Sequence, residues 1–225
     1  MAVQFGTRSG KEKIVFRVRA YDVVFWDFDG VIKDSVAVKT QAFFQLFEPF
    51  GKSIAERVLK HHEDNGGMSR FDKLPIYLEW AGLQPTPATV LEFSEKFSQA
   101  VTQGVIDSPW VLGVQRVLNN KDQNQIDVLI SATPQAELEY ILNKLELTRC
   151  FSAVYGAPIK KCDAVAEMLS VNKLNPTSCL MIGDATADME AAVANQVPFL
   201  LRKHVSNSSL FAAYAGPYIK DFSNV

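Results

Sequence analysis

Two aspartates separated by one residue follow a short apolar run near the start of the chain. Asp27 and Asp29 come directly after residues 21–26, which are rich in β-formers, and Gly30 follows them. Two carboxylates so close together repel each other, and a cation between them would relieve that repulsion. Oxygen ligands suit Mg²⁺, which also keeps water and substrate phosphate in its shell. Gly30 permits the tight turn that would follow the strand. The two carboxylates therefore indicate a magnesium site at the end of this strand.

A second carboxylate pair follows a later run of the same kind. Asp184 and Asp188 come after the apolar residues 179–182, where a loop is expected to lead into a helix. If that run is another parallel strand, its carboxyl end lies on the same sheet edge as Asp27 and Asp29. The second pair would then enlarge the cation site.

Groups that suit a phosphate follow two further runs. Ser131 ends the run 128–130, and its hydroxyl, together with backbone N–H groups before a helix, would make an anion site. Lys160 and Lys161 come shortly after the run 153–155. A lysine suits a phosphate as a point charge, so either of them could complete the site.

The apolar runs alternate with helical patterns along most of the chain. Strands are expected at residues 21–26, 128–130, 153–155, 179–182 and 197–201. Thr133 and Pro134 predict the start of a helix, with Thr133 as N-cap and Pro134 at the first helical position. The alternation predicts an α/β fold with a Rossmann-like parallel sheet and right-handed crossovers.

The stretch 36–107 interrupts this alternation. It is helical in pattern and contains no convincing strand. Since it lies between the first and second strands, we expect an inserted α-helical cap domain over the carboxyl edge of the sheet. The predicted organisation is an N-terminal arm at 1–20, a catalytic α/β core at 21–35 and 108–225, and the cap at 36–107.

Composition excludes several other classes of protein. The 225 residues carry 23 basic and 25 acidic side chains, and 48% are hydrophobic, so the chain can bury a large core. It has no basic surplus for nucleic acid, no polybasic run for a membrane surface, and no apolar run that spans a bilayer. Three cysteines without CxxC spacing suggest neither a disulfide framework nor a zinc site. We expect a cytoplasmic monomer or small homo-oligomer.

The four groups, in this order and each at a strand end, resemble the motifs of the haloacid dehalogenase superfamily of phosphohydrolases. The matching segments are Asp27 to Val31, Ser131 to Pro134, Gly156 to Lys161, and Met181 to Asp188. The resemblance covers about residues 23–201. The place of the insertion, between the first and second motifs, is similar to the helical cap type of β-phosphoglucomutase and phosphoglycolate phosphatase.

The resemblance implies roles for the carboxylates. Asp27 would be the nucleophile and would form an aspartyl-phosphate. Asp29 would protonate the leaving oxygen and then activate water. Mg²⁺ would sit between Asp27, the backbone carbonyl of Asp29, and Asp184. Asp188 would orient a metal-bound water or pair with Lys161.

The resemblance also implies the phosphate contacts. Ser131, the neighbouring Ala132, and a lysine of the third motif would hold the phosphate oxygens. The motif favours Lys161 over Lys160.

Two cap residues are candidates for binding the leaving group of the substrate. Gly66 and Gly67 allow a sharp bend, and Arg70 and Lys73 follow them, three residues apart on one helical face. In this cap type a loop near this place reaches into the active site. We therefore predict that Arg70 and Lys73 contact an anionic or polar leaving group, with solvated helix charges as the alternative.

The three histidines show no metal-ligand spacing. We interpret His61 and His62 as surface or cap-packing residues, and His204 as a surface residue.

The function predicted is a Mg²⁺-dependent phosphatase that hydrolyses a small phosphorylated metabolite, such as a sugar phosphate. The first alternative is a phosphomutase of the β-phosphoglucomutase type, which shares the motifs and passes the phosphoryl group to a second sugar hydroxyl. The other is a catalytically silent binding module, which should have lost Asp27, Asp29 or Asp184. A dehalogenase needs no acid at Asp29, so that carboxylate favours phosphate esters.

Overall fold

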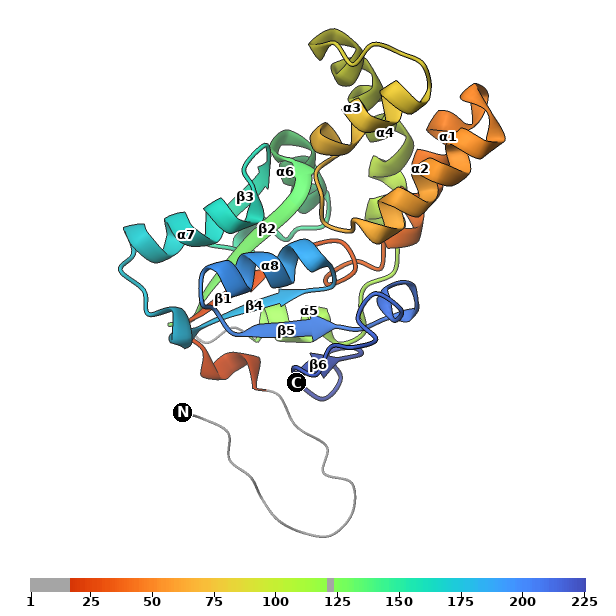
Figure 1. Cartoon of the computed structure of the whole chain (residues 1–225). Helices are drawn as coiled ribbons and strands as arrows, with labels where there is room; N and C mark the ends of the chain where they lie inside the picture. The colour runs from red at the N-terminus through yellow and green to blue at the C-terminus, as the bar shows by residue number, and fades with distance from the viewer. Residues whose placement is uncertain (1–16, 121–123) are drawn as a thin grey trace.

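A six-stranded parallel sheet forms the centre of the protein (Figure 1). The computed structural model describes residues 17–120 and 124–225. The strand order is β3-β2-β1-β4-β5-β6, and every pairing is parallel. The strands are β1 (Val23–Trp26), β2 (Ile126–Pro134), β3 (Ala153–Ala157), β4 (Cys179–Gly183), β5 (Phe199–Arg202) and β6 (Tyr218–Ile219). The predicted α/β, Rossmann-like class is confirmed.

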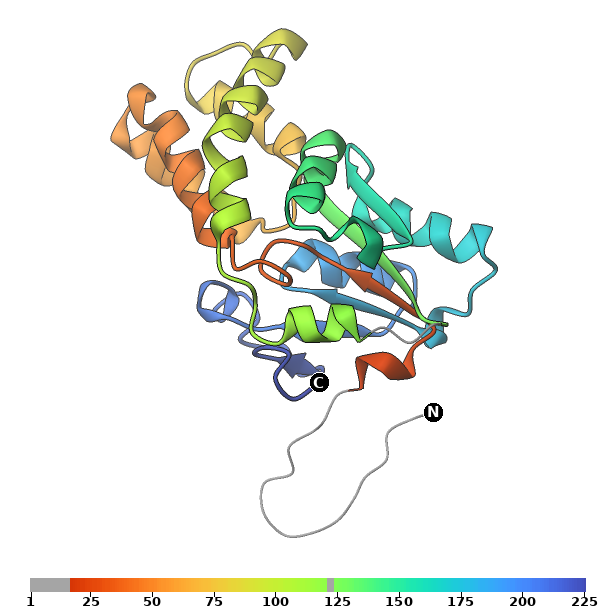
Figure 2. The same ribbon diagram turned by 180° about the vertical axis from the view of Figure 1, so that it is seen from behind.

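Helices cover both faces of the sheet, as Figures 1 and 2 show. They are α5 (Val114–Asn119) and α6 (Gln135–Lys144) on one face, and α7 (Lys161–Val171) and α8 (Thr186–Ala194) on the other. In β1, Val24 and Trp26 pack with α5 and α6, whereas Val23 and Phe25 pack with α7 and α8. Because both faces are covered, the whole strand is buried, which explains its continuous apolar run.

Strand β2 begins two residues earlier than the expected 128–130. The break in the apolar pattern is Asp127, which is fully buried. Its carboxylate accepts a hydrogen bond from Trp26 Nε1 at 2.8 Å and pairs with Arg19. A buried carboxylate with such partners is tolerated inside a strand.

The predicted start of α6 is wrong by one residue. The chain remains extended through Pro134, which pairs with Ala157 of β3. Pro134 therefore occupies the N-cap position and α6 begins at Gln135. The hydroxyl of Thr133, which was expected to cap the helix, instead accepts a hydrogen bond from Lys39.

Four helices fill the stretch between β1 and β2. They are α1 (Val36–Phe47), α2 (Lys52–Asp64), α3 (Arg70–Trp80) and α4 (Pro87–Asp107). Figure 1 shows them together at one end of the sheet. Stacked rings hold them to one another, with Phe43 and Phe97 centroids 4.0 Å apart and Phe47 edge-on to Tyr77 at 5.6 Å. We refer to these helices as the cap and to the sheet with α5–α8 as the core.

The two linkers between cap and core lie side by side. Asp34 N donates to Pro109 O at 2.8 Å, and Val111 N donates to Ile32 O at 3.0 Å. The buried Lys33 donates from Nζ to Ile106 O at 2.9 Å. These bonds fix where the cap leaves the core, directly beside the end of β1.

Most of the arm predicted at 1–20 lies outside the described residues; Val18–Ala20 forms a short 3₁₀ helix, η1. Across the described residues, no helix is both long enough and apolar enough to cross a membrane.

Candidate active site

One cavity of about 320 Å³ lies between the cap and the carboxyl edge of the sheet. Eight of the nine site residues predicted from the sequence line it: Asp27, Asp29, Arg70, Lys73, Ser131, Ala132, Lys161 and Asp184. The ninth, Asp188, is fully buried behind the wall. The strand ends explain this convergence, because β1, β2 and β4 are neighbours and their carboxyl ends meet at one edge.

Lys161 joins two of the carboxylates. Its Nζ lies 2.8 Å from Asp27 Oδ1 and 2.6 Å from Asp188 Oδ1. The other carboxylate oxygen of Asp188 accepts hydrogen bonds from the backbone N–H groups of Asp184 and Ala185, at 3.2 and 3.0 Å. Asp188 thus holds the turn after β4 in place and orients Lys161 toward Asp27. This contact matches one of the two roles that the resemblance implied for Asp188.

Among the described residues, the three carboxylates of this cluster contact one lysine and one histidine. One oxygen each of Asp27, Asp184 and Asp188 lies within 4.8 Å of the others, and all three residues are buried. Burial and the nearby Asp188 raise the pKa of Asp27 to about 7, and burial also raises the pKa values of Asp184 and Asp188. The surplus of negative charge and the all-oxygen donor set fit a divalent cation such as Mg²⁺. Asp188 already has three partners. Asp27 contacts Lys161 and Asp184 contacts His204, so these two carboxylates keep more capacity to bind the cation.

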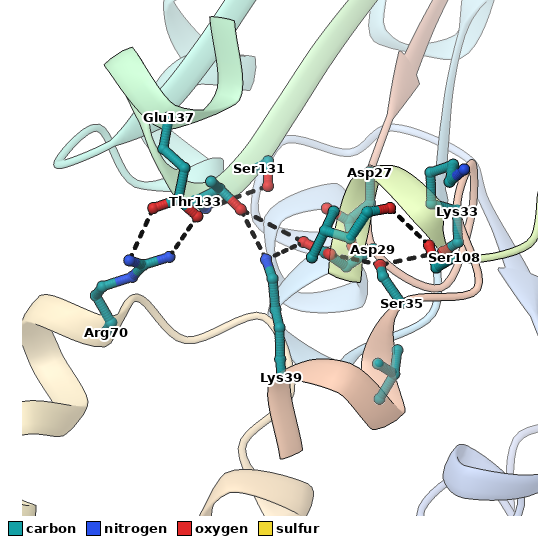
Figure 3. Close-up of polar contacts among 12 residues, drawn as sticks. Asp27, Asp29, Lys33, Ser35, Lys39, Arg70, Ser108, Ser131, Thr133 and Glu137 are labelled. Atoms are coloured by element: carbon teal, nitrogen blue, oxygen red, sulfur yellow. Dashed lines mark hydrogen bonds and ion pairs between the residues drawn. The ribbon is translucent and has the colours of Figure 1, made fainter. Parts of the chain in front are cut away.

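The side chain of Asp29 belongs to a different network (Figure 3). Its Oδ1 accepts from Ser35 Oγ at 2.6 Å, and its Oδ2 lies 2.5 Å from Lys39 Nζ. Lys39 also donates to Thr133 Oγ1 at 2.8 Å. Burial raises the pKa of Asp29, but Lys39 and Ser35 outweigh burial and bring it below its usual value. With its side chain so engaged, Asp29 has its backbone carbonyl left for the predicted metal contact.

Sequence reasoning missed Lys39. This residue comes from the first turns of α1, so it belongs to the cap and bonds to the core residues Asp29 and Thr133. Nothing in the spacing around Lys39 marks it. Only its position, one helical turn after the linker that follows Asp29, could have suggested that it faces the site.

The prediction that His204 lies at the surface is wrong. Its Nε2 is 2.8 Å from Asp184 Oδ2, and its side chain is 11% exposed. Asn207 supports the same turn, because its Nδ2 donates to Asp184 O and Arg202 O at 2.8 and 2.9 Å. Since β5 is the neighbour of β4, residues after β5 reach the end of β4. His204 follows a predicted strand as Ser131 does, and this position was the available signal.

Arg70 lines the cavity but already has a partner. Its guanidinium donates to both carboxylate oxygens of Glu137 in α6, at 2.9 and 2.8 Å (Figure 3). It also donates to Ser98 Oγ at 2.6 Å. The Arg70 side chain is 4% exposed and that of Glu137 is 8% exposed. The pair joins cap to core, and the predicted contact of Arg70 with a substrate stays a prediction.

Lys73 lies deeper in the cap wall and is 1% exposed. Its Nζ is 2.9 Å from His62 Nδ1 and 3.5 Å from His62 O. The ring of His62 packs on Phe43 with centroids 4.8 Å apart, so His62 is the cap-packing residue that we expected.

Comparisons with known proteins identify the family of the chain. Residues 24–201 match the haloacid dehalogenase-like hydrolase family. A phosphorylated carbohydrates phosphatase of Thermotoga maritima is 25% identical over 178 residues, which are 76% of this chain and 80% of that protein.

Two solved structures share the fold. A β-phosphoglucomutase from Clostridium difficile superposes with a TM-score of 0.69 at 19% identity, covering 91% of this chain and 93% of that one. A predicted phosphoglycolate phosphatase from Haemophilus somnus has a TM-score of 0.69 at 16% identity, covering 91% and 96%. The resemblance read from the motifs is confirmed: the chain belongs to the haloacid dehalogenase-like hydrolase family.

Proposed function

We propose that this protein is a Mg²⁺-dependent phosphatase that hydrolyses a small phosphorylated metabolite through an aspartyl-phosphate at Asp27. The family match and the phosphatase relative support a phosphoric monoester hydrolase, the class predicted from the sequence. The metal, the intermediate and the size of the substrate are our proposal.

One observation carries the proposal: two carboxylates from the end of one strand have opposite surroundings. Asp27 lies among carboxylates beside Lys161, and its pKa is raised to about 7. Asp29 lies beside Lys39 and Ser35, and its pKa is lowered. The two carboxylates thus line one cavity with separate partners, so that Asp27 can attack phosphorus beside Lys161 while Asp29 exchanges a proton with the leaving oxygen and then with water.

The proposed reaction has two steps. Asp29 takes up a proton as the substrate binds, Asp27 attacks phosphorus, the bond from phosphorus to the leaving oxygen breaks, and the proton passes from Asp29 to that oxygen. In the second step Asp29, now a carboxylate, takes a proton from water as the water attacks the aspartyl-phosphate. This releases phosphate and regenerates Asp27. Lys39 and Ser35 stabilise the charged form of Asp29, which suits the second step.

Further groups would hold the phosphoryl oxygens. The hydroxyl of Ser131, the backbone of Ala132 and the ammonium of Lys161 line the cavity beside Asp27. A divalent cation held by Asp27, Asp184 and the carbonyl of Asp29 would supply positive charge between nucleophile and phosphate.

The cap would supply contacts to the leaving group. Arg70 and Lys73 are the residues that we proposed from the sequence for this role. Of the two, Lys73 has no carboxylate partner among the described residues, so it is the better candidate.

A screen of phosphorylated metabolites with and without Mg²⁺, measuring free phosphate, tests the proposal. Asp27→Asn should abolish phosphate release while circular dichroism and the melting temperature remain close to those of the wild type, because the amide is nearly isosteric. Phosphate release by that variant at the wild-type rate would refute the mechanism. Formation of an isomeric sugar phosphate without net phosphate release would identify a phosphomutase instead.

A further inference from the structure

The positive side chains that line the cavity differ in whether they have a negative partner. Three of the four Lys and Arg residues are paired: Lys39 with Asp29, Arg70 with Glu137, and Lys161 with Asp27 and Asp188. The fourth is Lys73, which forms no ion pair with any described residue. Among the described positive groups that line the cavity, its amine is therefore the one available to pair with an anionic ligand.

The contacts of Lys73 leave its charge uncompensated. They comprise a ring nitrogen and a carbonyl of His62, and the face of Phe43 at 5.9 Å. Burial, with a smaller contribution from Lys39, lowers its pKa to about 7. A buried ammonium without a counter-charge destabilises a fold. A purely structural role would be served better by an apolar side chain in the same space.

The position of Lys73 suits a ligand group. Lys73 (α3) and His62 (α2) belong to the cap wall of the cavity, whereas Ser131 and Lys161 belong to the core. With its phosphoryl group at Asp27, a substrate would extend its leaving group toward the cap. Glu63 also lines the cavity, but it is exposed, so water screens its charge.

We propose that Lys73 binds a second anionic group, a carboxylate or a phosphate, carried by the leaving group of the preferred substrate. The inference rests on the proposed phosphatase function and makes its substrate class narrower: a phosphorylated acid or a bisphosphate in place of a neutral phosphate ester. The bound anion would supply the counter-charge that the protein lacks, and His62 would hold the amine from the other side.

Binding of non-hydrolysable ligands tests this without turnover. The probes are phosphonoacetate, methylenebisphosphonate and ethylphosphonate, which offer a carboxylate, a second phosphonate and an uncharged methyl group beside the same phosphonate. Calorimetric titration in excess Mg²⁺ would compare the wild type with Lys73→Met. Lys60→Met is the matched control, because Lys60 is an exposed lysine of the same cap.

The wild type should bind phosphonoacetate, methylenebisphosphonate or both at least about 10-fold more tightly than ethylphosphonate, which has no second anionic group. A difference of about 10-fold in affinity is the effect of one charge-assisted hydrogen bond. Lys73→Met should lose that preference and Lys60→Met should keep it. The probe that shows the preference identifies the second group as carboxylate or phosphate.

Equal binding of the three probes to the wild type would overturn the inference, and so would a preference that survives in Lys73→Met. Equal binding of the probes by the wild type would overturn the inference even where the variant fails to fold. Failure of the proposed function has a separate sign: the wild type would release no phosphate from p-nitrophenyl phosphate with Mg²⁺, whatever the probes do.

Discussion

Replacement of Glu137 by glutamine tests whether the contact with Arg70 holds the cap closed over the site. The contact consists of two parallel N–H···O bonds of 2.9 and 2.8 Å between α3 of the cap and α6 of the core. Ser98 of α4 completes it, since its hydroxyl donates to the same carboxylate. Both charged side chains are almost fully buried. The pair therefore links the two parts of the molecule in the arrangement that the structure shows, and we expect it to break when the cap opens.

The free-energy cost of Glu137→Gln follows from the contacts that Arg70 keeps in the closed and in the open form of the cap. Removal of one partner from a buried ion pair costs about 3–5 kcal/mol when the other remains buried. In Glu137→Gln the guanidinium of Arg70 keeps the amide oxygen, Ser98 Oγ and Ser94 O as acceptors. In the open form it returns to water. We therefore expect the substitution to destabilise the closed form by about 1.5–3 kcal/mol, the value of a hydrogen bond to a charged group, and to leave the stability of the open form unchanged. This is about a 10- to 100-fold change in its population.

The assay is kcat/KM for p-nitrophenyl phosphate and for the best metabolite of the screen. Because cap closure serves both substrates, Glu137→Gln should lower both values by the same factor. Arg70→Met should behave alike, and the double variant should be no worse than either single variant, since the two residues form one contact. Glu139→Gln is the control, because Glu139 lies on the same helix and is exposed.

A different pattern would refute the reasoning. If Glu137→Gln is fully active, and Arg70→Met loses activity on the metabolite but not on p-nitrophenyl phosphate, then Arg70 reads the leaving group and the cap does not depend on this pair.

Three further predictions concern the core site and Lys73. Lys161→Ala should lower phosphate release by about 100-fold or more, because the ammonium binds the transferring phosphoryl group; Lys160→Ala, at an exposed position, should have little effect. Chelation should abolish activity, Mg²⁺ should restore it, and Ca²⁺ should inhibit, since it takes more ligands at longer distances. Lys73→Met should be more stable than the wild type below pH 7, by at most about 5 kcal/mol. That advantage should shrink as the pH rises toward 10.5, because the folded wild type loses the costly proton near pH 7 and the unfolded chain keeps it until about 10.5. Urea unfolding at low and high pH measures the difference.

Most residues of the core site could be predicted because their positions depend on local pattern and one rule of topology. Asp27, Ser131 and Asp184 each lie at or just after the apolar part of a strand, and the carboxyl ends of parallel strands meet at one edge. The order of apolar runs along the chain was therefore enough to bring them to one cavity, where the structure has them. No long-range information was needed beyond the assumption of a single sheet.

The residues that were missed depend on how distant elements pack. Lys39 meets Asp29 and Thr133 only because the linkers between cap and core are bonded side by side, which sets where α1 begins. His204 meets Asp184 because β5 lies next to β4, a strand order that local pattern does not contain. Lys39 has no signature in spacing or composition, and the place of His204 after a strand becomes informative only once the strand order is known.

Arg70 and Lys73 also show that a residue's contacts can depend on the packing of distant elements. They lie three residues apart on one helix, so the sequence predicted one role for both. Packing separates them: Arg70 meets Glu137, 67 residues further along the chain, whereas Lys73 remains inside the cap wall and has no carboxylate partner in the part of the chain that the structure describes. A cation that the fold neutralises can hold two parts of a protein together. A buried cation that the fold leaves unpaired destabilises the empty protein, and either loss of its proton or a ligand of the opposite charge removes that penalty. Under the role that we propose for Lys73, the distribution of counter-charges, rather than the positions of the positive residues, would distinguish a structural contact from a recognition site in this cap.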